Sequence, residues 1–307
     1  MIPPSKIVDS RVLVTGATGR VAFPIARELA AHGNEVIGVA RFSDESTRAR
    51  LESVGVVPLR FELGRDDERE LPDADYVFHA GAALNTPPAE WEWQFEVNVQ
   101  ATGRLVRRYA NTKGLVFCST GSQYAYQGKR PLRESDPPGV HLGPYSVSKT
   151  SAEQLVQHLS RELGTPCTII RVFSTYGPEG GSPVDRLERM LTGKEIALHP
   201  DKPNNYNPIF EDDYVALGIR ALEVASAPVV VTNYAGSETV SAEDYLAYLG
   251  ALAGVEPRIV YRDDAWWPLA ADVTHMHEVL GKCTVPWREG MRRTLAATHP
   301  EMTLRED

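Results

Sequence analysis

The chain has 307 residues, of which 42% are hydrophobic and 24% are charged, a balance typical of a folded globular protein rather than a disordered one. Its 32 basic and 41 acidic residues leave a formal charge of −9, and no block of five or more Lys or Arg residues occurs, which argues against a nucleic-acid or anionic membrane surface. The three cysteines form no Cys-x-x-Cys pair, and neither a signal-peptide core nor a membrane-length apolar run occurs, so we expect reduced thiols, no metal site and a cytoplasmic protein.

The first half of the chain alternates between short apolar runs and helical patterns. Strands are predicted over residues 11–15, 35–40, 56–59, 76–79, 115–119 and 168–172. Helices are predicted over residues 19–32, 43–53, 90–110 and 144–163. Because strands that alternate with helices form parallel sheets covered on both faces, we expect an α/β fold with a doubly wound parallel sheet over residues 1–177.

Beyond residue 177 the alternation gives way to loops rich in Gly and Pro and to shorter elements. A strand is predicted over residues 229–232, and helices over residues 212–224, 242–252, 272–280 and 287–297. We expect residues 178–307 to form a smaller C-terminal lobe that binds substrate, with some of its segments returning to the sheet.

A glycine-rich turn links the first predicted strand to the first predicted helix. Gly16 permits a tight turn, while Gly19 and Ala22 are small enough for the backbone to approach a pyrophosphate at the helix N-terminus. The same spacing occurs in strand-to-helix turns that bind nothing. The correct flanking strand and helix favour dinucleotide binding here.

The residues at the end of the second predicted strand help to distinguish a site for NAD from a site for NADP. NAD-binding proteins usually have an acidic residue there, which accepts hydrogen bonds from the adenosine ribose. This chain has Arg41 there, with Ser43 two residues further on, and an arginine pairs well with a 2′-phosphate. We therefore expect NADP in preference to NAD. The alternative is a solvated Arg41, with Asp44 or Glu45 meeting the ribose.

Tyr145 and Lys149 stand four residues apart within a predicted helix. That spacing places the phenol and the ammonium on one face, where we expect the cation to lower the phenol's pKa and favour proton exchange near neutral pH. Taken singly, Tyr145 could be an aromatic residue that only packs at the start of a helix, and Lys149 could be an ordinary surface cation. Together with a dinucleotide turn, the pair predicts hydride chemistry.

These features resemble the extended short-chain dehydrogenase/reductases, also called the NAD-dependent epimerase/dehydratase family, which implies a Rossmann-type sheet. The resemblance is close over residues 11–178 and looser beyond. Six segments carry it, in order: Thr15-Gly16-x-x-Gly19, residues 75–82, Asn98 with Gly103, residues 119–124, Tyr145-x-x-x-Lys149 and residues 171–178.

The resemblance implies three catalytic residues. Thr120 is expected to hydrogen-bond the substrate oxygen, Tyr145 to donate or accept its proton, and Lys149 to hold the nicotinamide ribose. The motifs and the resemblance together predict these cofactor contacts: Gly16, Thr18, Gly19, Arg20, Val21, Arg41, Ser43, Glu62, Leu63, Ala80, Gly81, Ala82, Asn98, Tyr145, Lys149, Phe173 and Ser174. The predicted substrate contacts are Ala83, Tyr124, Ser174 and Tyr206, with Trp266 and Trp267 either stacking on substrate or packing in the core. His79 is expected to be a packed strand residue rather than a base.

Two departures from the family's pattern bear on the substrate. Members that bind nucleotide sugars commonly have Asn where this chain has Ser174, and Arg where it has Tyr206. Loss of the arginine removes a charge-assisted phosphate contact, which disfavours a usual sugar-nucleotide ligand unless Arg186, Arg189 or Lys194 substitutes.

The reaction type is also constrained. Dehydratases of this family have an Asp-Glu pair directly after the catalytic Thr, and this chain has Gly121 and Ser122 there, so dehydration is disfavoured. An epimerase and a reductase both stay open.

The alternative from another class is a non-catalytic dinucleotide-binding sensor or scaffold, although such relatives have usually lost the Tyr-Lys pair. The resemblance also suggests a homodimer in which helices 90–110 and 144–163 pack as a four-helix bundle.

Overall fold

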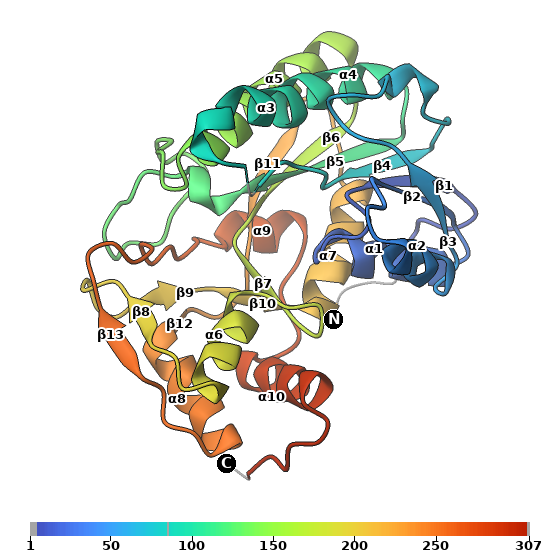
Figure 1. The fold of residues 1–307 in the computed structure, drawn as a ribbon. Helices are drawn as coiled ribbons and strands as arrows, with labels where there is room; N and C mark the ends of the chain where they lie inside the picture. The colour runs from blue at the N-terminus through green and yellow to red at the C-terminus, as the bar shows by residue number, and fades with distance from the viewer. Residues whose placement is uncertain (1–4, 85, 306–307) are drawn as a thin grey trace.

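A seven-stranded parallel sheet forms the centre of the computed structural model, which describes residues 5–84 and 86–305 (Figure 1). The strand order is β11-β6-β5-β4-β1-β2-β3, which confirms the expected doubly wound, Rossmann-type sheet. Its strands are β1 (Arg11–Thr15), β2 (Glu35–Ala40), β3 (Val56–Arg60), β4 (Tyr76–His79), β5 (Gly114–Thr120), β6 (Cys167–Val172) and β11 (Val230–Tyr234).

Ten α-helices are assigned within the described residues, and most of the long ones begin and end close to their predicted bounds. None of those helices has the length and apolarity needed to cross a bilayer. The helices are α1 (Ala22–Ala31), α2 (Glu45–Glu52), α3 (Trp91–Phe95), α4 (Ala101–Arg108), α5 (Pro144–Leu163), α6 (Ser182–Leu191), α7 (Glu211–Glu223), α8 (Ala242–Ala253), α9 (Thr274–Val279) and α10 (Trp287–Thr298).

Successive residues of β1 enter different cores, because side chains alternate across a strand. Val12 and Val14 pack on the face covered by α1 and α7, whereas Leu13 packs on the face covered by α4 and α5. Figure 1 shows these two helical layers on opposite sides of the sheet. The burial of both faces explains why the strands read as nearly continuous apolar runs.

Helix α5 carries the Tyr-Lys pair, and sequence signals fix both of its ends. Gly143, with a φ of 57°, precedes Pro144, whose missing N–H costs nothing in the first turn. Gly164 ends the helix in the left-handed conformation, with a φ of 71°. The prediction for residues 144–163 is therefore confirmed at both ends.

The predicted helix over residues 90–110 is a continuous helical run with a change of winding inside it. Helices α3 and α4 are joined by a π-helical segment, Glu96–Gln100. Such segments often occur at functional sites. Asn98 lies within this one and is fully buried.

The second half of the chain builds a separate apolar core between α6, α8 and α10, apart from the main sheet in Figure 1. Helix α6 was not predicted, because its start lies in a Gly- and Pro-rich stretch. Pro183 nevertheless fits the first helical turn, where no N–H is needed. Three strand pairs complete this part: β7 (Ser174–Tyr176) with β10 (Pro208–Phe210), β9 (Asn205–Tyr206) with β12 (Val240–Ser241), and β8 (Ile196–Leu198) with β13 (Ile259–Tyr261).

The order of the sheet reverses between β1 and β4. After β3 at one edge, the chain crosses back to place β4 on the other side of β1. The loops that follow β1 and β4 therefore meet at the carboxyl edge of the sheet. Ligands of open α/β sheets bind at this kind of switch point.

Candidate active site

A cleft of about 660 Å³ lies at the switch point, within the size range of small-molecule sites. Twelve of the predicted site residues line it: Gly16, Gly19, Arg20, Val21, Ala80, Ala82, Thr120, Tyr145, Lys149, Phe173, Ser174 and Tyr206. The other predicted contacts lie outside the lining that the described residues form: Thr18, Arg41, Ser43, Glu62, Leu63, Gly81, Ala83, Asn98 and Tyr124. Sequence reasoning missed several lining residues, among them Leu84, His141 and Ser182.

The glycine turn after β1 brings two backbones into contact. Gly16 has a φ of 66°, and a Cβ atom there would lie 2.9 Å from the Cα of Gly81 in the loop after β4. No side chain of the described residues caps the N-terminus of α1, while Arg20 and Val21 from this end line the cleft. Uncapped N–H groups and a nearby cation suit a pyrophosphate, so the residues fit a bound dinucleotide.

His79 is a buried strand residue whose hydrogen bonds define its tautomer. The Thr102 hydroxyl donates to the Asn98 carbonyl (2.7 Å), so it accepts from His79 Nε2 (2.9 Å). His79 Nδ1 then accepts from the Thr15 hydroxyl (2.6 Å), whose oxygen accepts from Gly81 N (3.0 Å). Burial lowers the pKa of His79 to about 3, so the ring stays neutral. As expected, His79 is a packed strand residue, and its hydrogen bonds hold the loop after β4.

Asn98 fixes the same loop from the π-helical segment. Its amide accepts from Ala83 N (2.7 Å) and donates both to Ala83 O (3.0 Å) and to Ser148 Oγ (2.9 Å). Ser148 in turn donates to the backbone carbonyl of Tyr145 (2.9 Å). The Asn98 amide is thus bonded to protein and positions the loop after β4, while the ligand contacts expected of Asn98 and Ala83 stay predictions.

The three predicted catalytic residues converge in the cleft from two elements. Thr120 ends β5, where its hydroxyl accepts from Ser122 N (3.2 Å) and shares a hydrogen bond with the Ser122 hydroxyl (3.0 Å), and it lines the same cleft as Tyr145. Tyr145 lies in the first turn of α5, and Lys149 lies one turn later. A hydroxyl and a phenol that meet in this way can both contact one substrate oxygen.

Burial governs the protonation of this site. It raises the pKa of Tyr145 to about 12, against the opposing effect of the hydrogen bond with Thr120. It also lowers the pKa of Lys149 to about 8, against the opposing effects of Cys118 and Glu153. The expected lowering of the phenol's pKa by Lys149 is thus wrong for the protein alone, because desolvation of the phenolate dominates. At neutral pH the pair is a phenol and an ammonium.

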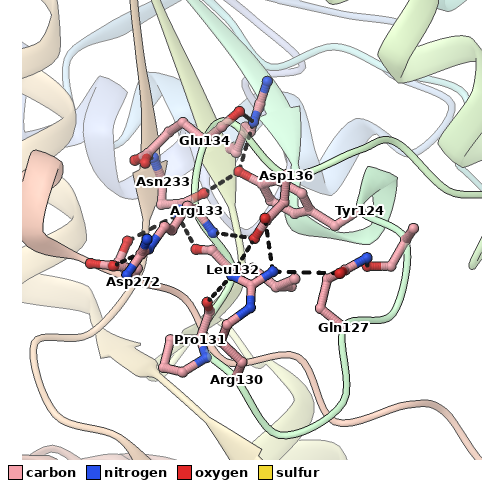
Figure 2. A network of polar contacts seen from close by, with 12 residues as sticks. Tyr124, Gln127, Arg130, Pro131, Leu132, Arg133, Glu134, Asp136, Asn233 and Asp272 are labelled. Carbon is pink, nitrogen blue, oxygen red and sulfur yellow. Dashed lines mark hydrogen bonds and ion pairs between the residues drawn. The ribbon is translucent and has the colours of Figure 1, made fainter.

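Tyr124, which is predicted to contact substrate, is 1% exposed and lies outside the cleft lining that the described residues form. The turn after Thr120 directs it inward, where its hydroxyl donates to Asn233 Oδ1 (2.6 Å) and accepts from Arg171 Nη1 (2.7 Å). Figure 2 shows Tyr124 and Asn233 within a polar network that also contains the Arg130–Asp136 ion pair (2.8 Å). This network anchors the segment that follows the end of β5.

The loop after β2 leaves Arg41 exposed. Within residues 5–84 and 86–305, Arg41 takes part in none of the ion pairs found, and Ser43 beside it is also exposed. Asp44 caps α2 by accepting from Ser46 N (2.9 Å), and hydrogen bonding to Ser46 lowers the pKa of Asp44. Glu45 lies 3.7 Å from Arg48. Asp44 and Glu45, the acidic residues that could instead meet the adenosine ribose, therefore already interact with residues of α2.

The two residues predicted near adenine occupy different surroundings. Glu62 lies 3.4 Å from Arg65. Leu63 packs so closely on Gly81 that a Cβ atom there would lie 2.5 Å from Leu63 Cδ1. Thr18, in the turn itself, is half-buried.

Aromatic side chains line the side of the cleft that faces the second half of the chain. Trp267 stacks on His141, with ring centroids 5.1 Å apart, and contacts Tyr126 at 5.2 Å. Trp266 is 65% exposed at the cleft. His141, four residues before Tyr145, carried no signal in the sequence, because its partner Trp267 is distant along the chain.

No group of three or more His, Cys, Asp or Glu side chains suited to a metal ion is found in the part of the chain that the structure describes. Cys118, Cys167 and Cys283 are free thiols. Burial raises the pKa of Cys118 to about 12, so this lining residue is a neutral thiol.

Residues 12–233 match the family described as the NAD dependent epimerase/dehydratase family. The chain belongs to this family. Membership confirms the resemblance to the extended short-chain dehydrogenase/reductases that the motifs indicated.

Members of the NAD dependent epimerase/dehydratase family that are similar to this chain include a reductase and two epimerases. The dTDP-4-dehydro-6-deoxy-D-allose reductase of Streptomyces bikiniensis is 28% identical, over 92% of this chain and 94% of the relative. An uncharacterized UDP-glucose epimerase of Bacillus subtilis, YtcB, is 31% identical, over 82% of this chain and 85% of its own. The solved UDP-glucuronic acid 4-epimerase of Bacillus cereus, in complex with UDP-glucuronic acid and NAD, has a TM-score of 0.82 at 21% identity, over 95% of this chain and 99% of that one.

Proposed function

We propose that this protein is an NAD(P)-dependent epimerase or reductase that acts at a carbinol or carbonyl carbon of a sugar-like or nucleotide-sugar-like substrate. The observation that carries the proposal is that Thr120, Tyr145 and Lys149 line one cleft together with the glycine turn, with Thr120 close enough to lower the pKa of the Tyr145 phenol. Relatives named as an epimerase and as a reductase support the reaction class.

The chemistry follows from the charges of the three side chains. A nicotinamide dinucleotide, when bound, supplies or accepts the hydride. In reduction, Tyr145 gives its phenolic proton to the substrate oxygen while Thr120 donates a hydrogen bond to the same oxygen. We expect the Lys149 ammonium to hold the nicotinamide ribose and its charge to favour the tyrosinate that forms. Oxidation reverses the proton transfer.

We propose NADP in preference to NAD as the cofactor. Support comes from Arg41, which is exposed and unpaired among the described residues, and from Asp44, whose carboxylate caps α2. A guanidinium in this place suits a 2′-phosphate and offers a ribose no acceptor.

Dehydration stays disfavoured, since Gly121 and Ser122 follow Thr120 where dehydratases have an acidic pair.

Epimerase and reductase differ in what happens to the cofactor. We expect an epimerase to release a tightly held, oxidised dinucleotide when the purified protein is denatured. A reductase consumes one equivalent of added NADPH for each product formed, which absorbance at the reduced-nicotinamide band measures.

The decisive experiment is the Tyr145→Phe variant, assayed with UDP- and dTDP-linked hexoses and 4-keto hexoses. We expect it to bind cofactor like the wild type and to lose about 10²- to 10⁴-fold in turnover. Tyr261→Phe, which alters a tyrosine outside the cleft lining, is the matched control and should keep full activity. Near-full activity of Tyr145→Phe contradicts the proposal. A wild type that binds dinucleotide and turns over none of these substrates favours the sensor or scaffold alternative.

We also propose that residues 178–307 act as the substrate-binding lobe, because Arg186, Tyr206 and Trp266 from this part line the cleft.

For the assembly, we propose a homodimer through α3, α4 and α5. A single species of twice the chain mass in light scattering supports it, and a monomer at micromolar concentration contradicts it.

A further inference from the structure

Arg186 is a partly buried cation in the cleft wall that the proposed chemistry does not use. It projects from α6, and its guanidinium lies over the rings of Tyr206 (5.2 Å to the centroid) and Tyr245 (5.7 Å). Its Nη1 donates to the Tyr245 hydroxyl, and its Nη2 lies 3.4 Å from the Tyr206 hydroxyl. No Asp or Glu carboxylate of the described residues forms an ion pair with it.

An arginine in this setting lacks the partner that burial normally requires. Desolvating a charge is costly unless an opposite charge or enough hydrogen bonds compensate it. The adjacent Asp185 is no such partner, because its carboxylate is 72% exposed and lies 3.7 Å from Arg20. Two neutral phenols satisfy only part of a guanidinium with five N–H donors. The remaining donors suit an anion that enters the cleft.

The other two cations considered from the sequence are placed differently. Arg189 is exposed and donates to the Glu195 carbonyl (2.9 and 2.6 Å), and Lys194 is exposed in the turn after α6. Of these three candidates, Arg186 is the one that lines the cleft. The structure thus selects among residues that the sequence could not rank.

The surroundings of Arg186 favour a ligand with more than one negative charge. Ser182, at the start of α6, lines the same cleft, and no side chain of the described residues caps this ten-residue helix. Helix N–H groups, the Arg186 guanidinium and the Tyr206 phenol supply several donors at the cleft, while the buried Tyr245 (2% exposed) holds the guanidinium in place. A diphosphate offers acceptors enough to use them.

We propose that Arg186, with Tyr206, binds the diphosphate of a nucleoside-diphosphate substrate and replaces the arginine that family members binding nucleotide sugars commonly have where this chain has Tyr206. The replacement comes from a different element, since α6 sends the guanidinium across to the face of the Tyr206 ring. The proposal rests on the proposed function in one respect, namely that the substrate is a nucleotide sugar.

Titration calorimetry with UDP and dTDP tests the site without any turnover. We expect Arg186→Met to weaken both ligands about 10- to 100-fold and to leave NADPH binding unchanged. Arg189→Met, on the same helix but outside the cleft, should bind UDP like the wild type. Adding Tyr206→Arg to Arg186→Met should restore UDP affinity, which a variant that merely misfolds cannot do. NADPH binding reports that each variant is folded.

Equal UDP affinity in Arg186→Met and the wild type overturns the proposal, as does a wild type that binds glucuronate but neither UDP nor dTDP. These failures differ from failure of the proposed function. If Tyr145→Phe stays active, the catalytic assignment is wrong even where UDP binding depends on Arg186. If turnover depends on Tyr145 but no nucleoside diphosphate binds, the diphosphate site alone is wrong.

Discussion

Glu153 and Arg171 form a buried ion pair one helical turn beyond Lys149. Arg171 Nε lies 3.2 and 3.1 Å from the two Glu153 carboxylate oxygens, and the Glu153 side chain is 1% exposed. The same carboxylate accepts from Ser119 Oγ (2.9 Å) and Gln123 Nε2 (2.7 Å), the residues on either side of the segment that carries Thr120. The pair therefore joins α5 and β6 to the end of β5.

Breaking this ion pair should destabilise the protein strongly. Glu153→Gln leaves the Arg171 charge unpaired inside the protein, and we expect about 3–5 kcal/mol of lost stability in urea denaturation. The Glu153→Met/Arg171→Met double variant should lose less stability than the sum of the losses in the Glu153→Met and Arg171→Met single variants, because neither charge is left unpaired. Glu52→Gln, in the exposed Arg48–Glu52 pair, is the control and should change stability by less than about 0.5 kcal/mol. Equal effects at the two sites contradict this account.

Thr120→Val removes the hydroxyl of Thr120 from the cleft that this residue lines together with Tyr145. We expect kcat to fall about 10²- to 10³-fold while cofactor affinity is kept, because the hydroxyl acts on the charge that develops at the substrate oxygen. Thr120→Ser keeps the hydroxyl and should retain most of the activity. Steady-state kinetics of both variants, with thermal melting as the check on folding, make the comparison. Unchanged kinetics in Thr120→Val remove the residue from the reaction.

The stability contribution of Lys149 should depend on pH. Burial lowers its pKa from 10.5 to about 8, so between these values the unfolded chain binds more protons at this residue than the folded protein does. The contribution of Lys149 to stability therefore rises as the pH increases from about 8 to about 10.5. Relative to Lys149→Met, the wild type should gain up to about 3 kcal/mol over this window. Urea denaturation of both proteins at several pH values measures it, and a constant difference between them contradicts it.

Arg41→Ala tests the choice of cofactor. We expect NADPH affinity to fall about 10- to 100-fold and NADH affinity to stay unchanged, because only the phosphorylated cofactor pairs with the guanidinium. Arg48→Ala on the nearby α2 removes another exposed arginine and should affect neither. Fluorescence titration of Arg41→Ala and Arg48→Ala with NADPH and with NADH, each compared with the wild type, measures these affinities. Equal loss for NADPH and NADH rules out the phosphate contact.

The sheet and helix α5 were predictable because their signals are local. Apolar runs marked the strands, and Pro144 and Gly164 marked the helix ends. The meeting of Thr120 with Tyr145 was predictable only through the family resemblance, since the two residues lie on different elements. Helix α6 was missed because its first turn reads as a loop.

The details of the site depended on burial and on partners distant in sequence. The direction of the Tyr145 pKa shift follows from desolvation, which a four-residue spacing does not reveal. Tyr124 turns inward because Asn233 and Arg171 satisfy its hydroxyl there. Arg186 could be chosen over Arg189 only once the placement of α6 was known.

Strand β11 has a consequence for synthesis on the ribosome. It pairs with β6 along the whole of Val230–Tyr234, so β6 is an edge strand until about sixty further residues have been made. A nascent chain that stops after β6 exposes an apolar, hydrogen-bonding edge that can recruit another strand. The glycine turn and the other early parts of the cleft are synthesised before β11 completes the sheet, so a fragment that ends between β6 and β11 should aggregate rather than fold.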